Sequence, residues 1–365
     1  MNETLGGLVG RLMEGPVDVI GDVHGEIGAL RALLQQLGYD EHGRHREGRR
    51  TVFVGDLTDR GPDSPAVATL VMDRAARGFA QCVLGNHELN ILRHEPKSGN
   101  AWIIDPSRRE QRPGGAYAHC AVAGEPFTSR FLRFIAALPL ALERDDLRVV
   151  HAAWIPGEIQ ALRAARGTTL AVFQHYEQQV DAQMAMEGLR ARADLEKTRH
   201  KAALTTYGEV APPLLPALAE CDERYQMGNP VRVATSGVER IAQQPFWSAG
   251  QWRMVDRVRW WEEYAEQVPV IVGHYWRRLA PVAAGKAAAG AGHSAHKPNL
   301  FEQVGPTDWL GPRRKVFCVD YSVAARSDRR AEGGNAAHGH LMAVRWPERE
   351  LWGEAGRVDE APRGP

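Results

Sequence analysis

Three short segments place carboxylate, imidazole and amide side chains beside glycine, each directly after an apolar, strand-like run. They are Gly21-Asp22-Val23-His24-Gly25, Gly55-Asp56-Leu57-Thr58-Asp59-Arg60-Gly61 and Gly85-Asn86-His87-Glu88. A single Asp at a strand end is more often a turn former or a helix cap than a metal ligand. Three such segments, however, supply the oxygen and nitrogen donors that bind divalent metals. The pattern therefore predicts a metal site assembled from separate strand ends.

Two isolated histidines further along the chain have similar settings. His151 follows the apolar run 147–150, and His274 follows the run 268–272 and one glycine. Imidazole nitrogens are common ligands of transition metals. We therefore expect His151 and His274 to complete a second metal position.

The elements that must position these residues alternate between short strands and helices over the first 155 residues. Strands are expected at residues 16–20, 51–54, 81–84 and 147–150, and helices at 26–37, 64–77 and 127–138. Repeated strand–loop–helix units predict a partly parallel sheet with helices packed on it. Functional groups in such sheets gather at the carboxyl ends of the strands, which is where the three segments lie.

This alternation stops after residue 155 and resumes near residue 268. We expect residues 1–155 and 268–350 to form one core, with further strands at 268–272, 315–319 and 341–346. Residues 156–267 would form an insertion, helical over 170–204 and then rich in aromatic residues, among them Trp247, Trp252, Trp260 and Trp261. Residues 283–298 are expected to form a mobile loop and residues 351–365 a disordered tail.

Composition and charge exclude several classes of protein. Hydrophobic residues make up 44% and charged residues 25% of the chain, which is ordinary for a soluble globular protein. The 45 basic and 45 acidic residues cancel, so no global field attracts nucleic acid or a membrane surface. The chain has no signal-peptide pattern, no apolar run of about 18 residues and no CxxC pair among its four cysteines. We therefore expect a cytoplasmic protein with no membrane contact and no general nucleic-acid binding.

The three segments and the two later histidines resemble the signature of the calcineurin-like metallophosphoesterase superfamily. Asp59-Arg60 is most similar to its phosphoprotein phosphatase branch, which includes bacterial serine/threonine phosphatases and diadenosine tetraphosphate hydrolases. The resemblance covers residues 16–151 closely and 268–346 more loosely. It implies an α/β fold of four layers, α/β/β/α, in which helices flank a β-sandwich and a mainly helical insertion forms a cap.

The resemblance implies a set of metal ligands. Asp56 would bridge two ions, of which the first is also held by Asp22 and His24 and the second by Asn86, His151 and His274. Such mixed ligands suit manganese, with iron, zinc, cobalt or nickel as alternatives, better than calcium or magnesium. Two ions roughly 3.5–4 Å apart can bind a shared hydroxide, which attacks phosphorus in line, together with both non-leaving phosphate oxygens.

Further roles come from the same resemblance. His87 matches the proton donor, Asp59 the carboxylate that orients it, and Arg60 a phosphate clamp that binds substrate together with Asn86. The family's glycine after the first late histidine and its arginine before the second are replaced here, by Ala153 and Val272. A second phosphate-binding arginine is implied, for which the insertion offers the candidates Arg240, Arg253, Arg257 and Arg259.

Two substrate classes remain open. Asp59-Arg60 and Glu88 follow the protein phosphatase form of their motifs and favour phosphomonoesters on serine and threonine, or tyrosine, side chains of proteins. The alternative is a nucleotide enzyme that acts on diadenosine polyphosphates or nucleic-acid phosphate ends. It is supported by residues 85–92, which resemble the dinucleotide hydrolases, and by the tryptophans of the insertion, since indole can stack on a base. Those tryptophans could equally form the apolar core of the cap.

Overall fold

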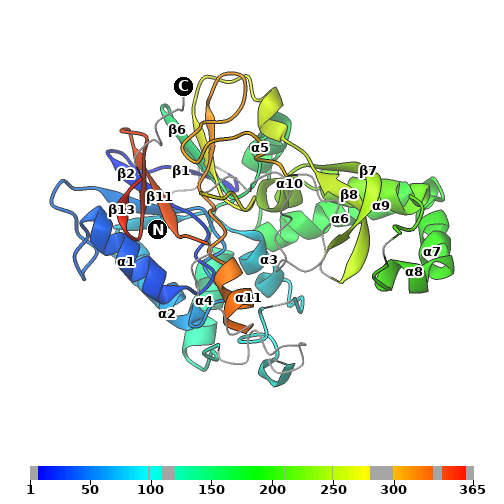
Figure 1. The fold of residues 1–365 in the computed structure, drawn as a ribbon, viewed down its shortest axis with the longest axis horizontal. Helices are drawn as coiled ribbons and strands as arrows, with labels where there is room; N and C mark the ends of the chain where they lie inside the picture. Colours follow the sequence, from blue (N-terminus) through cyan, green and yellow to red (C-terminus); the bar gives the residue numbers. More distant parts are fainter. Residues whose placement is uncertain are drawn as a thin grey trace.

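The computed structural model describes residues 7–97, 99–108, 120–208, 210–248, 250–279, 299–331 and 339–358. Two β-sheets form its centre (Figure 1). The first has the strand order β13-β12-β11-β2-β3-β4, with bounds β2 (Val17–Ile20), β3 (Arg50–Phe53), β4 (Ala80–Cys82), β11 (Met342–Trp346), β12 (Glu350–Gly353) and β13 (Gly356–Arg357). The second has the order β1-β5-β6-β9-β10, with bounds β1 (Val9–Arg11), β5 (Ala141–Arg144), β6 (Leu147–Val150), β9 (Val270–Val272) and β10 (Val316–Cys318).

Side chains along each strand divide between two apolar clusters, because successive residues of a strand point to opposite faces. Val19 of β2 and Ile271 of β9 belong to the cluster that joins the two sheets. Their neighbours Ile20 and Val270 belong to the cluster that the sheets share with the helices. The result is two facing sheets with helices outside them, so the predicted four-layer α/β/β/α class is confirmed.

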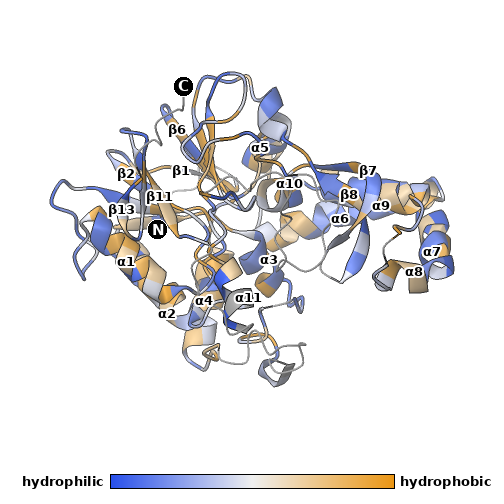
Figure 2. Ribbon diagram, viewed as in Figure 1, coloured by the Kyte–Doolittle hydropathy of each residue, from blue (hydrophilic) through white to orange (hydrophobic). Residues whose placement is uncertain are grey.

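The outer helices follow the sequence pattern closely. They are α1 (Ile27–Leu37), α2 (Ser64–Ala76), α3 (Asn86–Leu92) and α4 (Phe127–Ala136), with a 3₁₀ turn at Pro106–Arg108 and a late helix α11 (Ala325–Ala331). Leu30, Leu33 and Leu37 bury one face of α1, whose ribbon carries both hydrophobic and hydrophilic residues (Figure 2). Helix α1 packs beside α2 and near β12, and α2 packs on β4 (Figure 1). These contacts cover the first sheet.

The insertion contains more elements than its sequence predicts. Its helices are α5 (Pro156–Ala164), α6 (Thr169–Met186), α7 (Leu189–Arg199), α8 (Lys201–Thr205), α9 (Pro216–Met227) and α10 (Pro230–Ser236), and a 3₁₀ turn spans Trp260–Glu263. The expected helix 170–204 is therefore three helices, since Gly188 adopts a left-handed φ of 65° between α6 and α7. A hairpin that we did not predict joins β7 (Glu239–Ser248) to β8 (Gln251–Arg257).

The parts of the insertion differ in how they meet the core. Ile159 of α5, Val233 of α10, Trp260 and Phe173 near the start of α6 pack in the main core cluster. The rest of α6, helices α7–α9 and the hairpin project to one side (Figure 1). Trp252 and Trp261 are also buried, which favours the apolar-core interpretation of these tryptophans. The division into a core and an insertion at residues 156 and 267 stays a prediction.

The expected disordered tail is wrong for residues 351–358. There β12 pairs with β11, joining Leu351 to Val344, and β13 pairs with β12; the burial of Leu351 and Trp346 supplies the apolar contact that orders this end. Residues 359–365 and the expected loop 283–298 lie outside the described residues.

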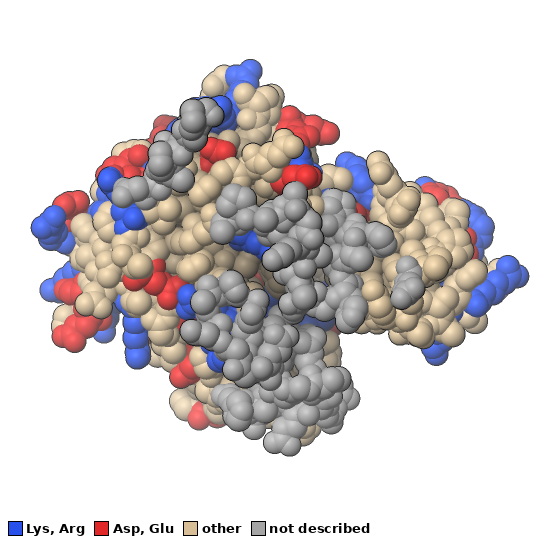
Figure 3. Space-filling model, in the orientation of Figure 1, with Lys and Arg blue, Asp and Glu red and all other residues tan. Residues whose placement is uncertain are grey.

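Surface properties agree with the composition. Acidic and basic side chains intermix over the face in Figure 3, as the zero net charge leads one to expect. No helix in the described part of the chain is both long and apolar enough to cross a bilayer. The four cysteines, all described, are buried and none is in a disulfide.

Candidate metal centre

Five strand ends bring the predicted ligands together. Asp22 and His24 follow β2, Asp56 follows β3 and Asn86 opens the helix after β4. Strands β2, β3 and β4 are parallel neighbours, so their carboxyl ends share one edge. In the second sheet, strands β6 and β9 are also parallel neighbours. His151 follows β6, and His274 follows β9. Asn86 is partly buried and the other five side chains are buried.

Asp56 lies at the middle of this set. Its Oδ2 is 3.7 Å from His24 Nε2, 3.4 Å from His151 Nε2 and 3.9 Å from His87 Nε2. Two groups of possible metal ligands share it, namely His24–Asp56–His87 and Asp56–His151–His274, and the ligand atoms within each group lie within 4.8 Å of one another. A carboxylate common to two donor groups is the arrangement expected of a bridging ligand.

The imidazole rings are oriented by the backbone. His151 donates from Nδ1 to the Val54 carbonyl at 2.7 Å, and His24 Nδ1 lies 3.2 Å from the Thr58 carbonyl. These bonds leave the Nε2 atoms directed at the carboxylates, as in many metal sites where the outer nitrogen is fixed by a carbonyl. His274 Nε2 is buried and has no hydrogen-bond partner in the described structure. Such a donor set, with one orphaned imidazole nitrogen, fits divalent transition metals.

The buried charges perturb one another. Burial raises the pKa of Asp22 well above its usual range, and the nearby Asp320 carboxylate adds to this effect. Although burial alone would lower the pKa of His151, the Asp56 carboxylate raises it to about 10. Burial lowers the pKa of His24 and of His274 well below the usual value. In the metal-free site, His151 therefore keeps an extra proton at neutral pH, whereas His24 and His274 are neutral.

His87 sits beside these groups, held by a second set of contacts. Its Nδ1 lies 2.6 Å from Asp59 Oδ2, and Trp102 donates its indole N–H to Asp59 Oδ1 at 2.7 Å. Arg60 Nη2 is 3.3 Å from His87 Nε2, while Arg60 Nη1 is buried without a hydrogen-bond partner in the described structure. The predicted acid, its orienting carboxylate and the predicted phosphate clamp thus adjoin one another.

Three further residues support the site, and the sequence did not reveal their roles. Trp102 holds Asp59, as described above. Glu88 accepts the N–H groups of Asp56 and Leu57, both at 2.9 Å, and so anchors the loop after β3. Asp320, at the end of β10, accepts the N–H of Trp276 at 2.9 Å and lies near Asp22. The strand-end position of Asp320 was the one signal available for it.

The backbone around the site is strained. Left-handed φ angles occur at several residues other than glycine: His24 (47°), Asp56 (47°), Asp59 (74°), Arg60 (68°) and His274 (70°). Such conformations cost energy and are typical of functional sites. Two glycines permit the close approach of the loops, because a Cβ at Gly85 would lie 2.3 Å from Asp56 Oδ1 and one at Gly273 2.0 Å from Asp22 Oδ1.

Of the four candidate arginines, Arg257 is the one whose charge acts on the site. After burial itself, its guanidinium is the main cause that lowers the pKa of His274. It also lies 6.0 Å from the ring of Tyr275. Arg240 pairs with Glu223 and Arg259 with Glu262, and the half-buried Arg253 lies near Glu239 and Asp222 within the insertion.

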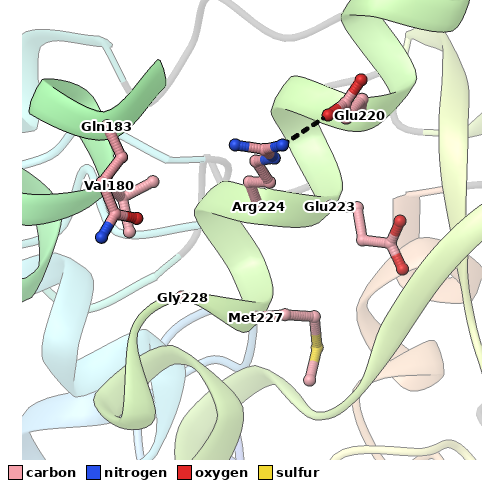
Figure 4. Close-up of a pocket in the computed structure, with 7 residues that line it drawn as sticks. All are labelled: Val180, Gln183, Glu220, Glu223, Arg224, Met227 and Gly228. Carbon is pink, nitrogen blue, oxygen red and sulfur yellow. Dashed lines mark hydrogen bonds and ion pairs between the residues drawn. The ribbon is translucent and has the colours of Figure 1, made fainter. Parts of the chain in front are cut away.

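A groove in the insertion is separate from this centre. Helices α6 and α9 line it, and Figure 4 shows Arg224 paired with Glu220 across one turn of α9. None of the predicted site residues contributes to its lining. It is therefore not the place where the predicted chemistry occurs.

Comparison with known proteins identifies the family. Residues 15–157 match the model of the calcineurin-like phosphoesterases. The chain is similar to the asymmetrical bis(5'-nucleosyl)-tetraphosphatase PrpE of Oceanobacillus iheyensis, with 30% identity over 196 residues that cover 53% of this chain and 76% of the relative. A PrpE of Bacillus velezensis is 35% identical over 141 residues, 37% of this chain and 55% of the relative, so the chain spans about half of that protein.

The chain is also similar to a solved structure, the cold-active protein-tyrosine phosphatase of a Shewanella species. The match covers 96% of this chain and 82% of that structure, with 16% sequence identity and a TM-score of 0.45. The predicted superfamily is confirmed by the sequence comparisons. The chain belongs to the calcineurin-like phosphoesterases, a family of phosphoester hydrolases with a dinuclear divalent metal centre.

Proposed function

We propose that this protein hydrolyses nucleoside polyphosphates of the diadenosine tetraphosphate type. The buried imidazole and carboxylate groups that converge on Asp56, beside the His87–Asp59 pair, are the observation that carries the reaction type. The substrate class is supported by the relatives named bis(5'-nucleosyl)-tetraphosphatase, one of which is 30% identical over 76% of its own length. The alternative that the sequence motifs favour, a phosphoprotein phosphatase, is the competing outcome of the test below.

The residues divide into two metal positions that share Asp56. Asp22 and His24 would hold one ion, and Asn86, His151 and His274 the other. Manganese suits this mixture of ligands, as do iron, zinc, cobalt and nickel. When bound, two such ions would supply Lewis acidity to the phosphoryl oxygens and an activated water.

Side chains of the protein would bind the phosphate and protonate the leaving group. Arg60, with its free Nη1, can bind a non-bridging phosphate oxygen. As the guanidinium turns to the phosphate it leaves His87 Nε2, which can then take up a proton from solvent and give it to the departing oxygen. Asp59 holds the opposite nitrogen of that ring and stabilises the charged imidazole before the transfer. Arg257 would add a second positive charge near His274.

A substrate comparison tests the proposal. With manganese present, kcat/KM is measured on diadenosine tetraphosphate and on phosphoserine, phosphothreonine and phosphotyrosine peptides. We expect the highest value on the dinucleotide, and a higher value on any phosphopeptide would overturn the proposed substrate class. Asp56→Asn is the control, because it should abolish every activity that belongs to this site.

A further inference from the structure

Trp276 is a large aromatic residue that stays exposed at the edge of the metal centre. It lies two residues after His274, and 43% of its surface is accessible. Other tryptophans near the site, such as Trp102 and Trp261, are buried and contribute to packing. The core therefore does not account for the exposed position of this ring.

The backbone holds Trp276 in place at some cost. Its φ angle is 54°, a left-handed conformation that is unusual for a bulky side chain. The N–H of Trp276 donates to Asp320 Oδ2 at 2.9 Å. The next residue, Arg277, is 1% exposed and donates to the Asp308 carbonyl at 2.7 Å. A strained turn fixed on both sides is a rigid base for a side chain that contacts a ligand.

The indole also adjoins the group expected to bind phosphate. The guanidinium carbon of Arg60 lies 5.1 Å from the centre of the Trp276 ring, within the range of a cation–π contact. Arg60 Nη1 is buried without a hydrogen-bond partner in the described structure. A phosphate bound to Arg60 would place the group it carries next to the exposed face of the indole.

We propose that Trp276 is a specificity residue on which a nucleobase of the substrate stacks. The inference rests on the proposed nucleotide function and extends it to a named contact. Every base offers a π-face, so an indole can bind it without reading its hydrogen-bonding edge. The competing interpretation is that Trp276 only positions Arg60 through the cation–π contact. The two interpretations differ in their predictions for a ligand that has no base. Its binding should need the Trp276 ring only if the ring positions Arg60.

The experiment compares ligands with and without a base in one assay. Turnover of diadenosine tetraphosphate gives KM and kcat, and inorganic tripolyphosphate serves as a competitive inhibitor that reports phosphate binding alone. Trp276→Ala should raise KM for the dinucleotide by roughly 5- to 150-fold, the range that stacking of one base supplies. The tripolyphosphate Ki should rise much less, kcat should fall less than KM rises, and Trp276→Phe should recover most of the affinity.

Tyr207→Ala is the matched control, because Tyr207 is also 43% exposed but lies in the insertion beside Trp247 and Trp252. It should leave both constants unchanged. Equal weakening of dinucleotide and tripolyphosphate by Trp276→Ala would overturn the inference in favour of an Arg60-positioning role. A change in KM below twofold, or a larger loss on a phosphotyrosine peptide than on the dinucleotide, would also overturn it. Failure of the proposed function is seen separately, in the wild type, as a preference for phosphopeptides.

Discussion

His87 Nδ1 lies 2.6 Å from Asp59 Oδ2, and the other oxygen of that carboxylate accepts the indole N–H of Trp102 at 2.7 Å. The three side chains are buried. They form a chain in which a buried tryptophan fixes a carboxylate and the carboxylate fixes an imidazole. Because Nδ1 is occupied, Nε2 is the atom of His87 that faces Arg60 and Asp56.

Replacing His87 by Asn should affect substrates according to their leaving groups. The alkoxide that leaves a phosphoserine peptide needs a proton, so kcat on that substrate should fall by roughly 10²–10⁴-fold, the usual contribution of a general acid. The nucleotide phosphate that leaves diadenosine tetraphosphate is a much weaker base, so its kcat should depend less on His87. For p-nitrophenyl phosphate, whose leaving group departs without protonation, the loss should be much smaller. Steady-state kinetics on a series of leaving groups would check this, and equal losses across the series would count against the role of His87 as the acid.

Replacing Trp102 by Phe should lower kcat while leaving KM nearly unchanged. The change leaves a buried Asp59 oxygen without its donor, which costs about 1–3 kcal/mol of folding stability, and it lets the Asp59–His87 pair move. Trp346→Phe is the matched control, because this buried indole donates to Asp146, outside the site, at 2.8 Å. We expect a larger fall in Tm for Trp102→Phe, because Asp59 is buried whereas Asp146 is exposed, and a fall in kcat for Trp102→Phe alone. Equal kcat values for the two would show that the Trp102 bond is purely structural.

Metal binding should release protons. In the metal-free protein the pKa of His151 is raised to about 10 by Asp56, despite burial, and burial together with Asp320 raises the pKa of Asp22. With a pKa of about 10, His151 keeps its proton at neutral pH, and the raised pKa of Asp22 favours its protonated form. A metal binds only neutral imidazole and ionised carboxylate. Manganese and protons therefore compete, and the apparent metal affinity should increase as the pH rises.

Isothermal titration calorimetry at pH 7.5, in buffers that differ in ionisation enthalpy, would measure this release. We expect a dependence on the buffer that corresponds to net release of protons from the protein. His24 and His274, whose pKa values are lowered by burial, should contribute none. A binding enthalpy that is the same in every buffer would contradict the prediction.

Replacing Arg257 by Ala should weaken the binding of polyphosphate substrates. The charge of Arg257 acts on His274, so its loss removes a cation from the neighbourhood of that ligand. A charged hydrogen bond contributes about 1.5–3 kcal/mol, which corresponds to a rise in KM of roughly tenfold or more. Arg240→Ala is the control, because Arg240 pairs with Glu223 instead. Similar KM values for both variants would exclude Arg257 as the second phosphate-binding arginine.

The sequence located the centre because motif and topology agree there. Asp22, Asp56 and Asn86 each end a parallel strand, and a strand end can be found from an apolar run followed by glycine. The partners that arrive from elsewhere could not be found in this way. Trp102 carries no pattern that links it to Asp59, 43 residues before it, and Asp320 gains its role only once β10 lies next to β9.

The insertion was harder to predict for a different reason. Strand β7 lacks clean alternation, since its register with β8 shifts between Ile241 and Phe246. Its polar and aromatic residues therefore gave no strand signal. The break between α6 and α7 depends on the left-handed conformation of one glycine, Gly188. A glycine within a helical pattern is compatible with either a continuous or a broken helix.

The central claim is that the groups around Asp56 form a dinuclear metal centre that drives phosphoester hydrolysis. It is tested most directly by adding manganese to the metal-free protein and measuring turnover of diadenosine tetraphosphate against the number of ions bound per chain. We predict that activity rises until two ions are bound per chain and then stays constant. The Asp56→Asn variant should neither bind two ions nor become active. Full activity with one ion, or activity that does not depend on metal, would contradict the account.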